Sequence, residues 1–247
     1  MDIGAHVKAI QEHGVALADA AERAGLDAAV RTCPDWQVRD LVAHAGQVHR
    51  WAGTYVISGS TDTDVALEQA PDDDTLLGWF REGHARLVDA INRAPADLQC
   101  WSFLPAPSPL AFWARRQAHE TTIHRADAES ANGKQLDVET ALAVDGIDEL
   151  LLGFYAGPGR RRLVADPPLV LGIRTTDAAA DDTWTVVIGP DGRDVTRGKA
   201  DGDCVISASA SDVYQFLWNR RDLDAVKIDG DPAVLALWRK RARITWS

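Results

Sequence analysis

Apolar residues recur at every third or fourth position in separate segments of the first 150 residues, which is the spacing of amphipathic helices. The fourth of these helices has the clearest boundaries, because Ser108 suits its N-cap, Pro109 its first turn and Asn132-Gly133 its end. The predicted helices cover 3–21, 38–55, 76–91, 109–131 and 138–152. Four long helices joined by short to moderate connections predict a helical bundle.

After the Gly-Pro-Gly sequence at 157–159, the pattern changes to a period of two with β-forming residues. Strands are predicted over 169–171, 184–188 and 204–206, and helices over 212–218 and 232–239, the first of them capped by Ser211. The acidic excess also ends here, since no glutamate follows Glu149. The fold class is therefore α+β, with a helical bundle in 1–155 and a smaller α/β domain in 156–247.

Composition excludes several classes of protein. The 37 acidic and 26 basic residues give a net charge of −11, which argues against a nucleic-acid or anionic-membrane surface. No apolar run approaches the roughly 20 residues that span a bilayer, and the N-terminus lacks the features of a signal peptide. Because the three cysteines lie far apart, we expect no disulfide framework and a cytoplasmic location. The oligomeric state stays open.

The fourth helix carries an unusually polar face. Spacings of three and four residues place on it Trp113, Gln117, Glu120, His124 and Asp127. Glu120 and His124 are four residues apart, so both can bind one metal ion. The alternative is an ordinary ion pair on the surface of the helix.

A third metal ligand has to come from another helix. His44 lies beside the apolar stripe of the second helix, and Asp40, one turn earlier, can accept a proton from its free ring nitrogen. His84 is a second candidate, which we expect to be a core residue, whereas His49 is expected on the surface. Two histidines, one glutamate and an open position suit a catalytic zinc ion, and other divalent transition metals stay possible.

Two runs of the sequence carry a family resemblance. The first is C-P-D-W-Q-V-R-D-L-V-A-H at 33–44, and the second is R-R-Q-A-H-E-T-T-I-H-R-A-D-A-E at 115–129. They resemble the P-x-W-x-V-x-D-L-x-x-H and R-x-x-x-H-E-x-x-x-H-R-x-D-A signatures of the actinobacterial, mycothiol-dependent maleylpyruvate isomerase family. F-L-W-N-R-R at 216–221 and I-D-G-D-P at 228–232 resemble its L-W-G-R and G-D-P segments, although Asn219 replaces the usual glycine.

The resemblance implies a DinB-like four-helix bundle followed by a sterol-carrier-like domain. It implies that zinc is held by His44, Glu120 and His124, the residues that the spacing also indicates. It further implies a functional arginine at Arg220, with Arg221 as the alternative. Asp127 is expected to support the ligands as Asp40 does. Weaker candidates for binding substrate or thiol are Arg116, Trp113, Trp101 and again Arg221.

These observations lead to a functional hypothesis. We expect a zinc-dependent enzyme that uses a low-molecular-weight thiol, mycothiol, to isomerise a small electrophilic substrate or to transfer sulfur to it. Two alternatives stay open. One is a metal-dependent hydrolase that needs no thiol, and the other is a non-enzymatic small-molecule-binding protein with a structural metal.

Overall fold

The computed structural model describes residues 1–155 and 163–242. The chain divides into two compact units, Met1–Leu136 and Asp137–Ser247. This division falls earlier than the change in composition because α5 (Thr140–Asp148) packs against α6 (Ala210–Leu217) within the second unit. The domain boundary expected between residues 155 and 156 stays a prediction.

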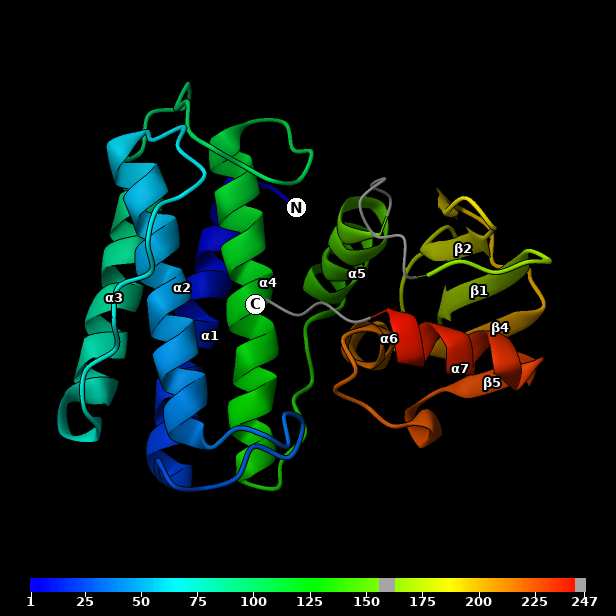
Figure 1. The fold of residues 1–247 in the computed structure, drawn as a ribbon, viewed down its shortest axis with the longest axis horizontal. Coiled ribbons are helices and arrows are strands. Elements are labelled where there is room, and N and C mark those ends of the chain that lie inside the picture. The colour runs from blue at the N-terminus through cyan, green and yellow to red at the C-terminus, as the bar shows by residue number, and fades with distance from the viewer. Residues whose placement is uncertain (156–162, 243–247) are drawn as a thin grey trace. The chain divides into compact units, whose positions relative to one another are not determined.

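Four helices make up most of the first unit, as the apolar spacing predicts (Figure 1). Their bounds are α1 Ile3–Ala24, α2 Val38–Ser58, α3 Asp73–Arg93 and α4 Pro109–Ala131. Both α1 and α2 pack against both α3 and α4, which gives a four-helix bundle. Its core includes Leu17, Leu41, Phe80 and Ala128, one from each helix in turn, so burial of the four apolar stripes holds the bundle together.

Side chains at the helix starts supply hydrogen bonds that the helices cannot make internally. The Asp2 carboxylate accepts the Ala5 N–H at 2.8 Å, at the start of α1. Ser108 caps α4 as predicted, with its hydroxyl oxygen 3.1 Å from the Ala111 nitrogen. Asp40 is likewise a capping residue, because its carboxylate accepts the Gln37 N–H at 2.8 Å at the start of α2.

The second unit contains one mixed sheet and several helices. The strands are β1 Leu169–Thr175, β2 Thr183–Ile188, β3 Arg193–Arg197, β4 Cys204–Ala208 and β5 Lys227–Gly230, in the order β3-β2-β1-β4-β5. Only the β1–β4 pair is parallel among these. The helical segments are α5, η1 (Glu149–Phe154, a π-helix), α6, η2 (Leu223–Ala225) and α7 (Pro232–Arg241). Both α6 and α7 pack against β1 and β4.

The three predicted strands are present as β1, β2 and β4, and alternate apolar positions in them are buried, among them Leu171, Ile173, Trp184, Val186, Cys204 and Ile206. The sequence analysis missed the two edge strands, β3 and β5, because their side chains are mostly polar and exposed. It was also wrong about the start of α6. Ser209 caps that helix through the Asp212 N–H, whereas the Ser211 hydroxyl accepts the Val138 N–H at 2.9 Å.

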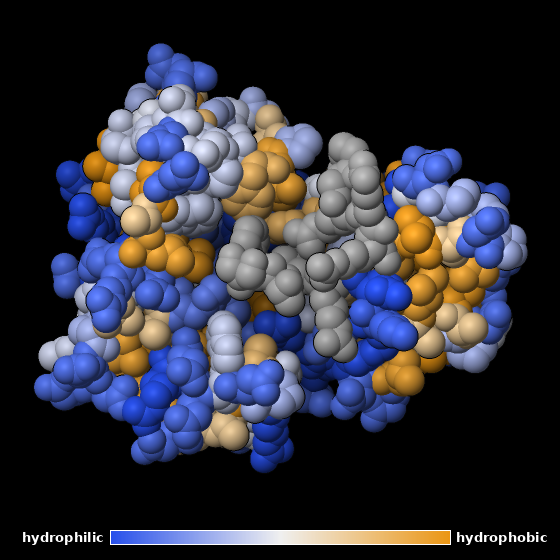
Figure 2. All heavy atoms as spheres, viewed as in Figure 1, coloured by the Kyte–Doolittle hydropathy of each residue, from blue (hydrophilic) through white to orange (hydrophobic). Residues whose placement is uncertain are grey.

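The visible surface of the bundle is largely hydrophilic, with small apolar patches (Figure 2). Among the described residues, none of the helices combines the length and the apolar character that a membrane span requires.

Candidate metal centre

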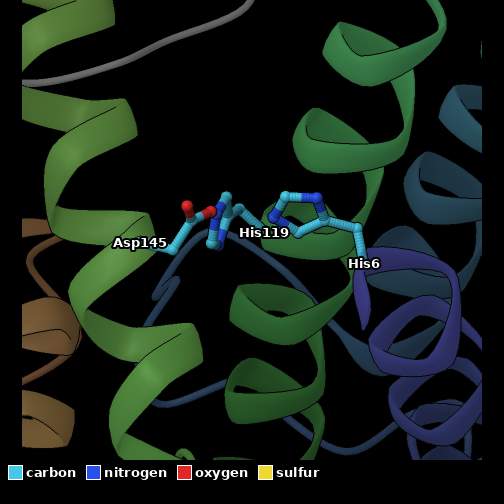
Figure 3. A group of neighbouring side chains, drawn as sticks. All are labelled: His6, His119 and Asp145. Atoms are coloured by element: carbon cyan, nitrogen blue, oxygen red, sulfur yellow. The ribbon is translucent and has the colours of Figure 1, made fainter. Parts of the chain in front are cut away.

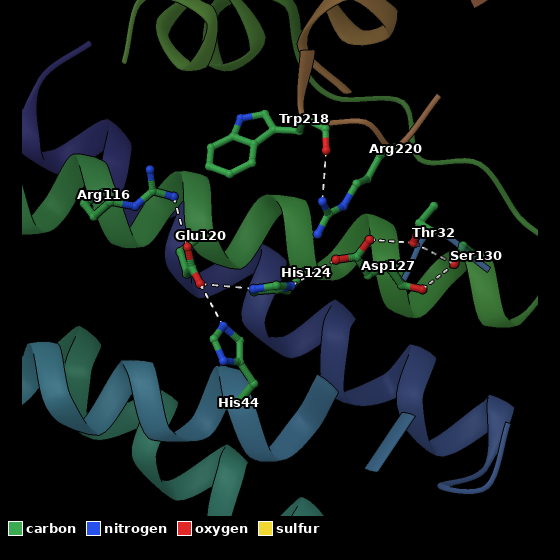
Figure 4. A network of polar contacts seen from close by, with 9 residues as sticks. All are labelled: Thr32, His44, Arg116, Glu120, His124, Asp127, Ser130, Trp218 and Arg220. Carbon is green, nitrogen blue, oxygen red and sulfur yellow. Dashed lines mark hydrogen bonds and ion pairs between the residues drawn. The ribbon is translucent and has the colours of Figure 1, made fainter. Parts of the chain in front are cut away.

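Three predicted ligands meet inside the bundle (Figure 4). Glu120 and His124 lie on successive turns of α4, and His44 faces them from the neighbouring α2. One carboxylate oxygen, Glu120 Oε1, lies 3.0 Å from His124 Nε2 and 3.3 Å from His44 Nε2. A ligand atom from each of the three residues lies within 4.8 Å of the other two. The side chains of Glu120 and His124 are almost fully buried, and that of His44 is 23% exposed.

Further polar side chains form hydrogen bonds with Glu120 and His124 on the sides away from the point where the three candidate ligands meet (Figure 4). The second ring nitrogen of His124, Nδ1, lies 3.0 Å from Asp127 Oδ2. The other Asp127 oxygen accepts the Thr32 hydroxyl at 2.6 Å. On the far side of Glu120, Arg116 Nη2 donates to Oε2 at 3.1 Å. Asp127 therefore supports His124 as expected, whereas Asp40 is committed to the start of α2.

The electrostatics of the cluster follow from these contacts. Burial alone raises the pKa of Glu120, but the adjacent His124, His44 and Arg116 outweigh it and hold that pKa well below its ordinary value. Burial alone lowers the pKa of His124, but Glu120 and Asp127 raise it to about 9. The carboxylates of Glu120 and Asp127 thus favour a positive charge at His124. Either the proton that His124 binds or a metal ion can supply that charge.

The donor set fits a divalent transition metal. Asp127 engages Nδ1 of His124, so the Nε2 atom is the one directed toward Glu120 and His44. His44, Glu120 and His124 would hold a zinc ion through two imidazole nitrogens and one carboxylate oxygen, and would leave a position open for water or substrate. Zinc accepts this set, and so do other divalent metals.

Trp36 forms an aromatic wall beside the cluster. Its ring lies 5.1 Å from that of His44 and is stacked at 6.1 Å, with an interplanar angle of 26°, on that of His124. Main-chain hydrogen bonds fix the segment, because the Trp36 carbonyl accepts the Val30 N–H and its own N–H donates to Cys33. The sequence analysis quoted Trp36 within a motif but gave it no role.

Three weaker candidates for binding substrate or thiol, Trp101, Trp113 and Arg116, make contacts with other side chains of the bundle. Trp113 is fully buried, stacks on Tyr55 at 5.1 Å and donates its indole N–H to the Trp101 carbonyl. Both tryptophans therefore contribute to an aromatic cluster in the bundle, and their roles in ligand binding stay predictions. Arg116 is committed to Glu120 by its ion pair.

Arg220 and Arg221 belong to the second unit. The Arg220 guanidinium donates to the Trp218 carbonyl at 2.9 Å, and Arg221 Nε lies 3.2 Å from Asp212 Oδ1. Their functional roles also stay predictions.

The other histidines of the bundle are buried. His84 is a core residue, as expected, but the expectation of a surface position for His49 was wrong, because its side chain is fully enclosed. His6 of α1 and His119 of α4 form an edge-to-face ring pair with centroids 6.0 Å apart (Figure 3). Figure 3 also labels Asp145, which belongs to α5 of the second unit.

The fold and the cluster together define a class: a helical-bundle protein with a three-residue candidate metal centre, followed by a small mixed-sheet unit. Comparisons with known proteins narrow this class. The family model for the mycothiol maleylpyruvate isomerase N-terminal domain matches residues 7–129, and that for the MDMPI C-terminal domain matches residues 141–237. The chain therefore belongs to the mycothiol-dependent maleylpyruvate isomerase family.

Solved structures agree with the fold. The chain is similar to a crystal structure of the mycothiol-dependent maleylpyruvate isomerase and to one of its histidine-to-alanine mutant, with TM-scores of 0.60 and 0.63. Each comparison covers 93% of both chains at 13% identity, so it establishes the fold alone. A comparison with curated proteins gave no match.

Proposed function

We propose that this protein is a zinc-dependent enzyme that uses mycothiol to isomerise a small electrophilic substrate. The observation that carries the proposal is the convergence of His44, Glu120 and His124 on one point of the bundle. Membership of the family supports the choice of thiol and of reaction. The zinc ion would be held by these three side chains, and when bound it would lower the pKa of a coordinated thiol and so favour the thiolate.

The chain's own residues prepare this chemistry. Asp127 holds the ring of His124 through Nδ1, which leaves Nε2 as the ligand atom. Arg116 pairs with Glu120 Oε2, so the carboxylate stays ionised and keeps Oε1 directed at the histidines. Trp36 covers one side of both imidazole rings and helps to exclude water.

The isomerisation itself belongs to the thiol and the substrate. The thiolate adds to an electrophilic carbon and converts a double bond to a single bond, about which the adduct can rotate. Re-forming the double bond expels the thiolate unchanged and yields the isomer. If a proton is captured instead, the thiol stays attached through its sulfur, and the outcome is transfer of the whole thiol to the substrate.

Metal stoichiometry provides the first test. We expect about one zinc per chain in the wild-type protein after reconstitution and desalting, measured by mass spectrometry. His44→Ala, Glu120→Ala and His124→Ala should each lose it. Glu129→Ala is the matched control, because this carboxylate lies on the same helix but pairs with Arg23. A wild-type protein that retains no zinc, or three variants that all retain it, would contradict the assignment.

Turnover of maleylpyruvate distinguishes the mechanism from its alternatives. We expect isomerisation only when both zinc and mycothiol are present. Turnover without thiol would favour a metal-dependent hydrolase. A protein that melts earlier after chelation, yet still binds a small molecule and turns nothing over, would favour a structural metal.

The functional arginine is tested separately. We propose that Arg220 binds a carboxylate of the substrate or of the thiol, because its planar guanidinium can donate two parallel hydrogen bonds. Arg220→Lys should then reduce kcat/KM while leaving the zinc content unchanged, and Arg221→Lys should have the smaller effect. The reverse order would assign the role to Arg221.

A further inference from the structure

The segment that joins α1 to α2 places a hydroxyl group behind the metal cluster. Thr32 lies in this segment, and its Oγ1 is 2.6 Å from Asp127 Oδ1 (Figure 4). Main-chain hydrogen bonds fix the segment on both sides of Thr32, from the Cys33 N–H to the Val30 carbonyl and from the Val38 N–H to the Ala28 carbonyl. The position of the hydroxyl is therefore set by the fold rather than by a free side chain.

The hydrogens in this network can be assigned from the chemistry of each partner. A carboxylate only accepts, so the Thr32 hydroxyl donates to Asp127 Oδ1. The Ser130 hydroxyl donates to the main-chain oxygen of Asp127 at 2.7 Å, because a carbonyl also only accepts. Asp127 Oδ2 accepts the Nδ1–H of His124. Thr32 and His124 thus donate to different oxygens of the same carboxylate.

Burial makes this arrangement consequential. Asp127 is fully enclosed, so bulk water does not replace a hydrogen bond that its carboxylate loses. The terminal side-chain torsion of an aspartate takes a broad range of values, and a hydrogen bond to each carboxylate oxygen narrows that range. With a metal ion on Nε2, the one ring hydrogen of His124 lies on Nδ1, and the orientation of Asp127 sets where that hydrogen is accepted.

We propose that Thr32 is a positioning residue for the metal centre: its hydroxyl orients Asp127 so that His124 presents Nε2 to the metal. The proposal rests on the proposed function for its metal, but the orientation of His124 is a property of the protein with or without an ion. In this role Thr32 acts through two other side chains, Asp127 and His124.

The test compares three substitutions. Thr32→Val removes the hydroxyl at nearly constant shape, and Thr32→Ser keeps it. Thr122→Val is the matched control, because Thr122 is a buried threonine whose hydroxyl donates to the Ala118 carbonyl within α4. Zinc affinity is measured by competition with a chromophoric chelator. The Nδ1–H of His124 is followed by nuclear magnetic resonance of protein labelled with 15N in histidine.

We expect Thr32→Val to weaken zinc binding about tenfold, at the low end of the effects known for residues behind metal ligands. The Nδ1–H resonance of His124 should broaden or exchange faster with water. Thr32→Ser and Thr122→Val should stay within about twofold of the wild type in affinity and keep the resonance. Unchanged affinity together with an unchanged resonance in Thr32→Val would overturn the proposal.

Failure of the proposed function gives a different result. If the wild-type protein binds no zinc, the resonance of metal-free His124 decides the role of Thr32 on its own. A resonance lost in Thr32→Val but kept in Thr32→Ser would then support the orienting role, and a resonance kept in both would refute it.

Discussion

Two groups of histidines in the same bundle differ in the partners that surround them. His44 and His124 contact a carboxylate, whereas the Nε2 atoms of His49 and His84 hydrogen-bond neutral groups. His49 Nε2 lies 2.9 Å from the Thr121 hydroxyl oxygen, and that hydroxyl donates its own hydrogen to the Gln117 carbonyl at 2.6 Å. His49 is therefore the donor. His84 Nε2 likewise donates to the Ile10 carbonyl at 3.0 Å.

The partners, rather than the degree of burial, decide the charge. Burial lowers the pKa of His49 to about 3 and also lowers that of His84, so both rings are neutral at pH 7. Burial likewise lowers the pKa of His124, but Glu120 and Asp127 overcome it and raise that pKa to about 9. A buried histidine beside carboxylates is thus prepared for a cation, and one beside a hydroxyl or a carbonyl is a structural residue.

The largest expected effect is on stability in acid. Burial and the nearby Arg125 lower the pKa of His13 to about 4. His13 and His49 are therefore neutral in the folded protein, whereas in the unfolded chain they bind protons below about pH 6.5. Their contribution to the free energy of unfolding is complete above pH 6.5. It is lost as the pH falls from 6.5 toward about 4 for His13 and about 3 for His49. Each should lose about 2 kcal/mol between pH 6.5 and 5, at about 1.4 kcal/mol per pH unit. Chemical denaturation of chelator-treated protein at both pH values measures the loss.

The metal cluster should respond in the opposite direction. His124 has a raised pKa, so its contribution to the metal-free protein is complete below pH 6.5 and is lost as the pH rises through about 9. Stability of the metal-free protein should therefore fall on both sides of neutral pH. A profile that stays flat from pH 6.5 to 5 would contradict the neutral state of the core histidines.

Glu120→Gln should give His124 a neutral neighbour, like those of His49 and His84. His124 would then face a neutral amide on one side, so its pKa should fall toward the ordinary value, and zinc affinity should fall by more than about a hundredfold. A histidine resonance titration and chelator competition measure the two changes. His49→Gln is the control, and it should keep zinc binding. A Glu120→Gln protein that binds zinc normally would break the comparison.

The position of the buried His84 ring depends on Gly14. A Cβ added at Gly14 would lie 2.2 Å from His84 Nε2, the atom that donates to Ile10. Gly14→Ala should therefore displace the His84 ring and destabilise the protein by about 2–3 kcal/mol, as overpacking does. Urea denaturation measures this loss. Gly78→Ala is the control, because its Cβ would meet nothing within 4 Å, and equal effects in both variants would argue against the contact.

The smallest expected effect concerns a single hydroxyl. Thr121→Val removes the acceptor of His49 and leaves a buried N–H without its partner, which should cost about 1–2 kcal/mol. Zinc content should stay unchanged. Urea denaturation and mass spectrometry check the two statements, and lost zinc would mean that the two histidine groups are coupled.

Much of the fold could be predicted because its signals are local. Ser108 and Pro109 mark the start of α4, and the apolar runs at 169–171, 184–188 and 204–206 lie in β1, β2 and β4. His49 was predicted on the surface because it points away from His44, and this was wrong. It lies four residues after Ala45 and three before Ala52, on the buried stripe of α2, and a neutral histidine can be buried when its N–H has an acceptor.

The candidate site was predictable where helical spacing or a family motif applied, as for Glu120 and His124. Thr32 had no such signal, because it lies in an irregular segment and meets Asp127 only through the tertiary fold. Similarly, Asp40 has the right spacing to His44, but nothing in the spacing shows that the Gln37 N–H takes its carboxylate.

The irregular segment before α2 has a consequence for anyone who re-engineers this chain. It delivers both Thr32 and Trp36 to the cluster, and its main-chain hydrogen bonds tie Leu26 to Arg39 and Val30 to Trp36. Loops between helices are the usual places to open a chain for circular permutation or to insert a reporter domain. Here, new termini or an insertion would detach two side chains from the site while leaving all four helices able to form.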